Sequence, residues 1–182
     1  MAMRNSENRY GWAAITMHWL VALAVFGLFG LGFWMVELSY YDEWYRKGPD
    51  IHRAVGILLF AVVVVRLVWR MSNPSPRPLP NHKPWEVFAA HVAHWALYLL
   101  MFVAMISGYL ISTADGSSIS VFGLFEVPSV TGTVKGMEDT AGAVHYWITW
   151  VLVALAGIHA LGAFKHHFVD RDETLKRMFG KS

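Results

Sequence analysis

The 182-residue sequence contains no cysteine. This absence excludes disulfide bonds, thiolate-held iron–sulfur clusters, cysteine-based zinc sites and thioether-linked c-type haem. Charged residues are also scarce, because only 15% are Asp, Glu, Lys or Arg whereas 55% are hydrophobic. With a mean hydropathy of +0.39, the chain is too apolar for an ordinary soluble domain. Its formal net charge of +2 gives no reason to expect a nucleic-acid partner.

Long apolar runs, in contrast, are abundant. Four of them are long enough to cross the ~30 Å hydrocarbon layer of a bilayer as helices. They cover approximately residues 12–36, 52–70, 87–111 and 141–164. We therefore expect an all-α integral membrane protein, a four-helix bundle that forms one domain over residues 1–182 and ends in a tail at 165–182.

The segments between these runs are expected to lie outside the membrane. Residues 37–51 are charged and aromatic, which favours an interfacial loop, and residues 112–140 read as a long polar loop. Residues 71–86 hold five of the seven prolines, so we expect an extended connector in which His82 is solvated. The charged tail is expected to form at most a short amphipathic helix on the membrane surface.

The positive charges predict the orientation of the chain. Both termini and the Pro-rich connector with its flanks carry eleven of the fifteen Lys and Arg residues. By the positive-inside rule these segments face the cytoplasm. The outer loops hold eight acidic residues against four basic ones, a local excess of four negative charges.

The last apolar run contains two histidines, which are rare within membrane spans and suggest a function there. His145 and His159 are fourteen residues apart, which is ~21 Å along an α-helix. At about 100° per residue, fourteen steps end within about 40° of a whole number of turns. The two imidazoles therefore share one helix face at two depths, and each needs a partner from another span.

Low-spin b-type haem is the chemistry that uses paired axial imidazoles inside a helix bundle, and it needs no covalent link to the protein. With the predicted topology, His52 is the only outer partner for His145. The inner side has several contenders besides His159, namely His18, His91, His94, His166 and His167. We thus expect two b-type haems, with the ligands of the inner one left open by spacing alone.

Each candidate also has a simpler interpretation. Alone, His18 or His52 is as typical of an interfacial anchor as of a ligand, and His166 and His167 are typical of a solvated tail. The pair His91 and His94, at i and i+3, is equally compatible with capping, a propionate contact or a quinone contact. Arg66 is expected to extend its guanidinium to the lipid headgroups, and the alternative is a pairing with a haem propionate, for which Arg53 is a second candidate.

Several motifs together resemble the bacterial cytochrome b561 family, four-helix dihaem membrane proteins that include superoxide oxidase. They also resemble the cytochrome b subunits of membrane-bound hydrogenases and formate dehydrogenases. The resemblance covers nearly the whole chain. Besides the Pro-rich connector, its carriers are MHWL at 17–20, IHRAVGILL at 51–59, RLVWR at 66–70, HVAHWALYLL at 91–100, VHYW at 144–147, GIHA at 157–160, and KHHF with the DETLKRM tail.

The resemblance implies an inner haem between His18 and His159 and an outer haem between His52 and His145. It also implies quinone binding near the inner haem, with His166 as the matching tail histidine. His91 and His94 match the family's third-span pair, whose role we leave as haem-pocket or quinone support.

We expect a dihaem b-type cytochrome that transfers electrons between a periplasmic donor and ubiquinone. One alternative is a superoxide oxidase, although the negative outer loops disfavour an anionic substrate and make a small periplasmic carrier protein at least as suitable a donor. The other alternative is a non-redox, His-rich carrier of transition metals, since imidazole binds zinc, copper and nickel. The histidines are dispersed over two depths without intramembrane Asp or Glu, which argues against a carrier.

Overall fold

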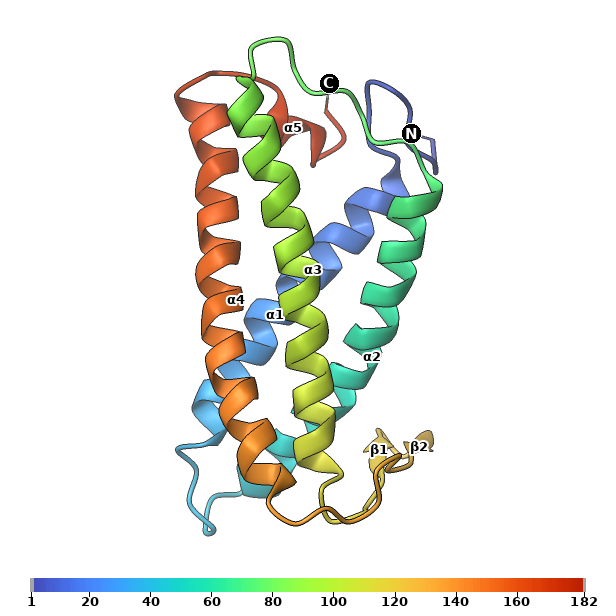
Figure 1. Cartoon of the computed structure of the whole chain (residues 1–182), viewed down its shortest axis with the longest axis vertical. Coiled ribbons are helices and arrows are strands. Elements are labelled where there is room, and N and C mark those ends of the chain that lie inside the picture. The colour runs from blue at the N-terminus through green and yellow to red at the C-terminus, as the bar shows by residue number, and fades with distance from the viewer. Residues whose placement is uncertain (1, 182) are drawn as a thin grey trace. The chain divides into compact units, whose positions relative to one another are not determined.

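Four long helices dominate the computed structural model, which describes residues 2–181 (Figure 1). They are α1 (Trp12–Met35), α2 (Trp44–Ser72), α3 (Pro84–Ser112) and α4 (Met137–Phe168). Each is long and apolar enough to cross a membrane. The predicted all-α membrane fold class is confirmed, with one small hairpin as the only sheet in the described part of the chain.

The apolar surface of these helices is mostly exposed rather than packed in a protein core. Only 6% of the most apolar stretch of α1, and the same share of α4, is buried. Leu23 is 72% exposed and Leu161 is 66% exposed. Such surfaces are too extensive for a soluble monomer and suit contact with lipid tails.

The chain divides into two compact units, and each takes part of all four long helices. Unit 1 is formed by Met1–Ala22, Val62–Tyr98 and Ala154–Ser182, and unit 2 by Leu23–Ala61 and Leu99–Val153. The two units are described separately below.

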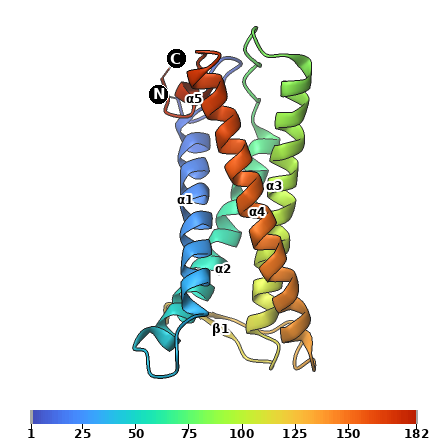
Figure 2. The same ribbon diagram turned by 90° about the vertical axis from the view of Figure 1, so that its left-hand side faces the viewer.

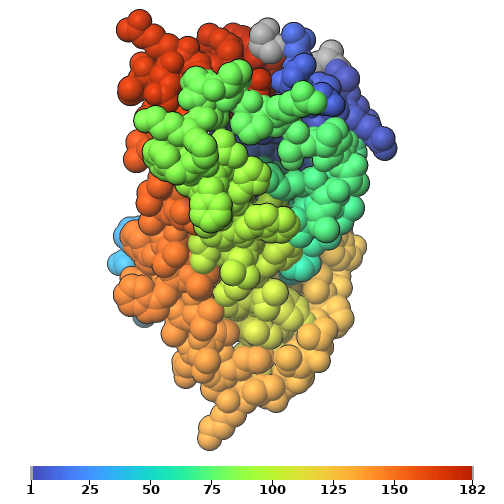
Figure 3. All heavy atoms as spheres, turned by 45° about the horizontal axis from the view of Figure 1, so that its top comes forward, coloured from blue at the N-terminus to red at the C-terminus, as the bar shows by residue number. Residues whose placement is uncertain are grey.

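In unit 1 the N-terminal segment, the Pro-rich connector and the tail are joined by polar contacts. The backbone N–H of Arg77 donates to the carbonyl of Glu7 at 2.7 Å, and the two side chains form an ion pair at 2.8 Å. Arg177 in the tail donates to the carbonyl of Arg77 at 2.9 Å. Figure 3 shows the three segments gathered on one face of this unit.

The tail folds back against α1 within the same unit (Figure 2). It forms a short helix of four residues, α5 (Thr174–Arg177). Trp19 of α1 donates its indole N–H to the carbonyl of Met178 at 2.8 Å and stacks on Phe179 at 4.9 Å between ring centres. The tail is thus held by specific contacts with the protein.

In unit 2 the connection from α3 to α4, expected as a loop, contains an antiparallel hairpin. Its strands are β1 (Ile119–Val121) and β2 (Phe125–Val127), with Val121 opposite Phe125. The turn between them places Phe122 at φ 53° and Gly123 at φ 71°, the left-handed backbone that a type I′ hairpin turn requires.

Helix α2 begins at Trp44, eight residues before the expected apolar span, so half of the expected loop at 37–51 is helical. Hydropathy locates the lipid-facing part of a helix, whereas helix formation continues wherever backbone and side-chain contacts allow it. Here Lys47 pairs with Glu43 at 2.5 Å. Pro49 lies inside the helix, and Arg53 donates to its carbonyl at 3.2 Å.

Candidate functional site

The outer histidine pair lies in unit 2, where α2 and α4 contribute one imidazole each. The ring centres of His52 and His145 are 6.2 Å apart, and the ring planes are inclined at 74°. Both side chains are half-buried. The structure therefore brings together the two residues that the sequence analysis paired.

One nitrogen of His145 is held by the backbone of α3. Its Nδ1 lies 2.8 Å from the carbonyl oxygen of Ala104 and 3.3 Å from Oγ of Ser107. Because a carbonyl oxygen only accepts, Nδ1 must carry the hydrogen and donate it. The lone pair of the neutral imidazole is then on Nε2, which is the arrangement that metal-ligating histidines commonly show.

Glycines leave space beside both outer imidazoles. A Cβ at Gly32 of α1 would lie 3.1 Å from Cε1 of His52, and a Cβ at Gly108 of α3 would lie 3.1 Å from Cε1 of His145. Such contacts are closer than side chains normally tolerate. Nδ1 of His52 is buried without a hydrogen-bond partner, so this pocket contains a polar atom that the protein alone does not satisfy.

The inner histidine pair lies in unit 1, where α1 and α4 contribute one imidazole each. The ring centres of His18 and His159 are 6.3 Å apart, with ring planes at 67°. His94 of α3 approaches the same imidazole, with its ring centre 5.1 Å from that of His159. Helices α1, α3 and α4 therefore bring three imidazoles together. All three histidines were among the predicted candidates for the inner site.

Both pairs have the spacing expected of two imidazoles on one metal ion. A metal–imidazole bond is about 2.0–2.1 Å long and the ring centre lies roughly 1.1 Å behind the nitrogen, so two trans ligands place their ring centres about 6.3 Å apart. The observed separations are 6.2 Å and 6.3 Å. The residues present therefore fit axial ligation of haem iron.

Arg66 of α2 lies against the inner pair, so the expectation that it extends to the headgroups is wrong. Its Nη2 is 3.0 Å from Nδ1 of His18, and its guanidinium lies 5.5 Å from the ring centre of Tyr98. Because a guanidinium only donates, Nδ1 of His18 accepts in this arrangement and Nε2 carries the hydrogen of the neutral ring. Ligation through Nε2 would require Arg66 to turn away.

The third-span histidines are separated by the structure. His94 is half-buried beside His159. His91 is exposed and donates Nδ1–H to the carbonyl of Val87 on its own helix at 2.7 Å. Of the two, only His94 contacts a member of the inner pair.

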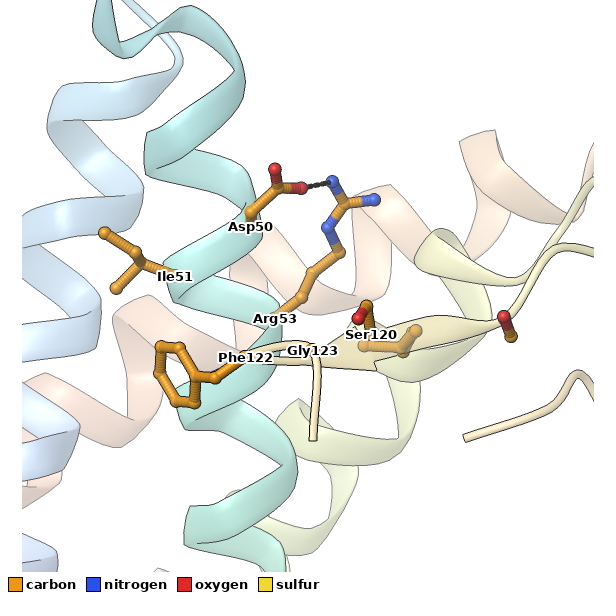
Figure 4. A pocket seen from close by; sticks show the side chains of 8 residues that line it. Asp50, Ile51, Arg53, Ser120, Phe122 and Gly123 are labelled. Atoms are coloured by element: carbon orange, nitrogen blue, oxygen red, sulfur yellow. Dashed lines mark hydrogen bonds and ion pairs between the residues drawn. The ribbon is translucent and has the colours of Figure 1, made fainter. Parts of the chain in front are cut away.

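Arg53, a candidate propionate contact, lies in unit 2 at the edge of a cavity of about 340 Å³. Its guanidinium pairs with Asp50 at 2.5 Å, and Ser120 and Phe122 of the hairpin line the same cavity (Figure 4). Arg53 therefore already has an anionic partner, which offsets its positive charge.

His166 and the connector histidine are part of a polar cluster in unit 1. His166 lies 2.7 Å from Asp170, and His82 lies 3.0 Å from Asp172 and 3.1 Å from Oγ1 of Thr174. The interpretation of His82 as simply solvated is wrong, because its side chain is only 14% exposed. Its partners are about ninety residues away in the sequence, and no local pattern identifies them.

The carboxylates of this cluster are strongly stabilised as anions. Burial opposes the ionisation of Asp172, but hydrogen bonds from Thr174, Asn81 and His82 outweigh it and lower its pKa to about 2. A hydrogen bond from Lys165 lowers the pKa of Asp170 as well.

Sequence reasoning missed the groups that position His145. The sequence offers one signal, the small pair Ser107–Gly108 within an otherwise bulky apolar span. In the structure Ser107 Oγ and the Ala104 carbonyl contact Nδ1, while Gly108 leaves room for the ring.

Comparison with known proteins agrees with the family that the sequence motifs indicate. The family model described as "Prokaryotic cytochrome b561" matches residues 9–181. A protein named "Cytochrome b561 homolog 2" from Escherichia coli (strain K12) is 52% identical over 182 residues, covering 100% of this chain and 97% of the relative. "Probable superoxide oxidase CybB" from Yersinia pestis is 33% identical over 180 residues, covering 96% and 98%.

A more distant relative, "Cytochrome b561 homolog 1" from Escherichia coli (strain K12), is 26% identical over 94% of this chain and 97% of its own length. The predicted family is confirmed, and with it a multi-pass membrane cytochrome in contact with lipid. Membership implies b-type haem and electron transfer, which disfavours the non-redox metal carrier. The chain belongs to the prokaryotic cytochrome b561 family.

Proposed function

We propose that this protein is a dihaem b-type cytochrome of the bacterial inner membrane. His52 and His145 are the axial ligands of an outer haem, and His18 and His159 are those of an inner haem. The observation that carries the proposal is the pair of ring-centre separations, 6.2 Å and 6.3 Å, each joining two different helices. Two such pairs arise within one chain whose family implies b-type haem.

At the outer pair, the backbone of α3 prepares one imidazole for ligation. The Ala104 carbonyl holds Nδ1–H of His145 and so presents Nε2 to the pocket. When bound, haem iron supplies reversible one-electron transfer, whose potential the protein tunes through ligands, hydrogen bonds and burial. In the haem-bound protein, Arg66 turns from Nδ1 of His18 to a propionate of the inner haem. Arg53 is the candidate propionate contact at the outer haem.

Haems held by these two pairs would transfer electrons between a periplasmic donor and ubiquinone on the cytoplasmic side, where both termini are predicted to lie. His94 and His166 are the candidate quinone contacts, since both are half-buried in unit 1. His91 is a poorer candidate because it is exposed and bonded to its own helix. A small carrier protein with a basic surface suits the acidic outer loops as donor.

The ligand assignment is tested by the variant His145→Ala. Loss of this imidazole removes one of the two outer ligands and leaves the inner pair intact. We expect the purified variant to retain half of the haem per chain, with the b-type spectrum of the inner haem unchanged. His91→Ala is the matched control and keeps full haem content. Retention of both haems in His145→Ala would contradict the assignment.

A second candidate function is superoxide oxidation at the outer haem, with quinone reduction at the inner one. The observation in its favour is the 33% identity to a relative named a probable superoxide oxidase. Against it, Arg53 is neutralised by Asp50, and the outer loops carry excess negative charge.

The two donors are distinguished by adding a superoxide-generating system to the oxidised cytochrome. Superoxide as donor predicts haem reduction that superoxide dismutase abolishes and that Arg53→Gln slows. If the donor is a carrier protein, superoxide leaves the haem oxidised, whereas a reduced basic carrier reduces it at a rate that falls with salt.

A further inference from the structure

Three segments that are distant in the sequence place metal-binding atoms together in unit 1. His82 comes from the Pro-rich connector, His166 from the last turn of α4, and Asp172 from the segment before α5. One imidazole nitrogen of each histidine and a carboxylate oxygen of Asp172 all lie within 4.8 Å of one another. The three side chains are only 14%, 15% and 8% exposed, so the cluster is not a group of solvated surface charges.

The distances within this cluster match those around a tetrahedral zinc ion. Zinc–nitrogen and zinc–oxygen bonds of about 2.0–2.1 Å place neighbouring ligand atoms about 3.3 Å apart. Oδ2 of Asp172 lies 3.0 Å from Nε2 of His82 and 3.5 Å from Nδ1 of His166. The imidazole rings lie side by side, with centres 4.4 Å apart and planes inclined at 37°. Both nitrogens therefore converge on one carboxylate oxygen.

A neighbouring cluster of Glu86, His166 and Asp170 is a poorer metal site. Lys165 already bonds both of its carboxylates, at 2.7 Å to Glu86 and 2.6 Å to Asp170. That ammonium offsets one of the two negative charges and would repel a metal ion. No lysine or arginine forms an ion pair with Asp172 within residues 2–181, so the position between His82 and Asp172 is the one that attracts a cation.

Groups around Asp172 hold its carboxylate in the orientation that ligation requires. The backbone N–H of Thr174 donates to Oδ1 at 2.8 Å, and Asn81 donates to Oδ2 at 3.1 Å. Each carboxylate oxygen has two lone pairs, so Oδ2 can keep Asn81 and still bind a metal. Hydrogen-bonded support of this kind is typical of metal ligands.

We propose that His82, His166 and Asp172 form a zinc site that fastens the tail and the connector to the end of α4. Two imidazole nitrogens select zinc over magnesium or calcium, which prefer ligand sets made of oxygen. A water molecule completes the tetrahedron. Zinc at Nδ1 of His166 replaces the hydrogen bond of that nitrogen to Asp170 and leaves Nε2 for a quinone, so the zinc and quinone assignments use different nitrogens of this imidazole.

The test uses full-length protein without a polyhistidine tag, purified in detergent and stripped with a chelator. Zinc is added back, excess is removed by dialysis, and metal per chain is measured by mass spectrometry. We expect one zinc ion per chain and slower proteolysis of the tail in its presence. Magnesium and calcium should give neither effect.

Variants of the ligands and a matched control complete the test. We expect His82→Ala and Asp172→Asn each to weaken zinc binding by more than about tenfold, whereas His91→Ala, which removes an exposed histidine of the same unit, retains it. An unchanged haem spectrum shows that each variant is folded. Zinc retention in both ligand variants, or no zinc above the level of a buffer blank in the parent protein, would overturn the proposal.

Discussion

At the scale of single residues, the outer histidine pair depends on the absence of side chains beside it. Gly30 and Gly32 are both in α1, yet a Cβ at Gly30 meets no atom within 4 Å whereas one at Gly32 lies 3.1 Å from His52. In the sequence, these two glycines are simply small residues within an apolar run. The sequence does not distinguish the one that touches an imidazole, because the contact joins two helices.

This difference predicts the result of a matched pair of substitutions. Gly32→Ala is expected to push the ring of His52 by a few tenths of an ångström, which weakens haem binding or shifts the potential of the outer haem. Gly30→Ala is expected to leave both unchanged. Haem titration and a redox titration of the purified proteins measure the effect. Equal behaviour of the two variants would show that the space beside His52 is not needed.

The contact between Arg66 and His18 was also beyond sequence reasoning. An arginine near the end of an apolar span usually extends to the headgroups. Here its partner is 48 residues away and Tyr98 lies beside its guanidinium. The histidines themselves were easier to predict, because spacing within one helix places His145 and His159 without any knowledge of packing.

At the scale of elements, the hairpin in the connection from α3 to α4 carries local backbone strain. Phe122 has φ 53°, a conformation that costs a residue with a Cβ about 1–2 kcal/mol. Asparagine tolerates it better and is favoured at this position of a type I′ turn. The sequence has Phe-Gly instead of Asn-Gly or Asp-Gly at this turn, so it gives no hairpin signal there, which explains why the segment was expected to be a loop.

Phe122→Asn is therefore expected to stabilise the hairpin by about 1 kcal/mol. Slower amide hydrogen exchange in β1 and β2 would show this. Leu124→Asn serves as the control, since it changes an exposed side chain of the same turn without relieving strain. Faster exchange in Phe122→Asn than in the parent would contradict this account of the turn.

The anchoring of the tail should depend on pH through Asp172. Its pKa falls from 3.8 to about 2 in the folded protein, so the contribution is present above pH 4 and is lost as the pH falls through about 2. Partial solvent access limits this contribution to on the order of 1 kcal/mol. In chelator-treated protein we expect proteolysis of the tail to rise over that pH window.

Asp172→Asn should abolish this pH dependence, whereas Glu173→Gln, an exposed neighbour, should preserve it. Hydrogen exchange or an acid-stable protease provides the measurement. If proteolysis of the tail still rises at low pH in Asp172→Asn, a group other than Asp172 causes the pH dependence.

At the scale of the whole molecule, the sequence predicts the membrane class well and the ends of its helices poorly. Four apolar runs specify four helices, because only a helix satisfies its own backbone polar groups in lipid. The same criterion misses residues 44–51 at the start of α2 and residues 165–168 at the end of α4. These polar turns continue a helix outside its apolar part, where hydropathy carries no information.

The orientation of the molecule is open to a direct test, because the chain has no cysteine of its own. Ser118→Cys is predicted to react with a membrane-impermeant maleimide in intact cells of a Gram-negative host. Ser75→Cys, in the Pro-rich connector, is predicted to react only after the inner membrane is opened. Both serines are exposed, so a difference reports sidedness, and the opposite pattern would reverse the predicted topology.

The central claim is that four histidines hold two b-type haems in one chain. A pyridine haemochrome assay on the detergent-purified protein, together with its reduced-minus-oxidised spectrum, tests this most directly. We predict sharp b-type bands and two haems per chain. One haem per chain would mean that one pair is misassigned. Protein free of haem after expression with an adequate haem supply would contradict the account altogether.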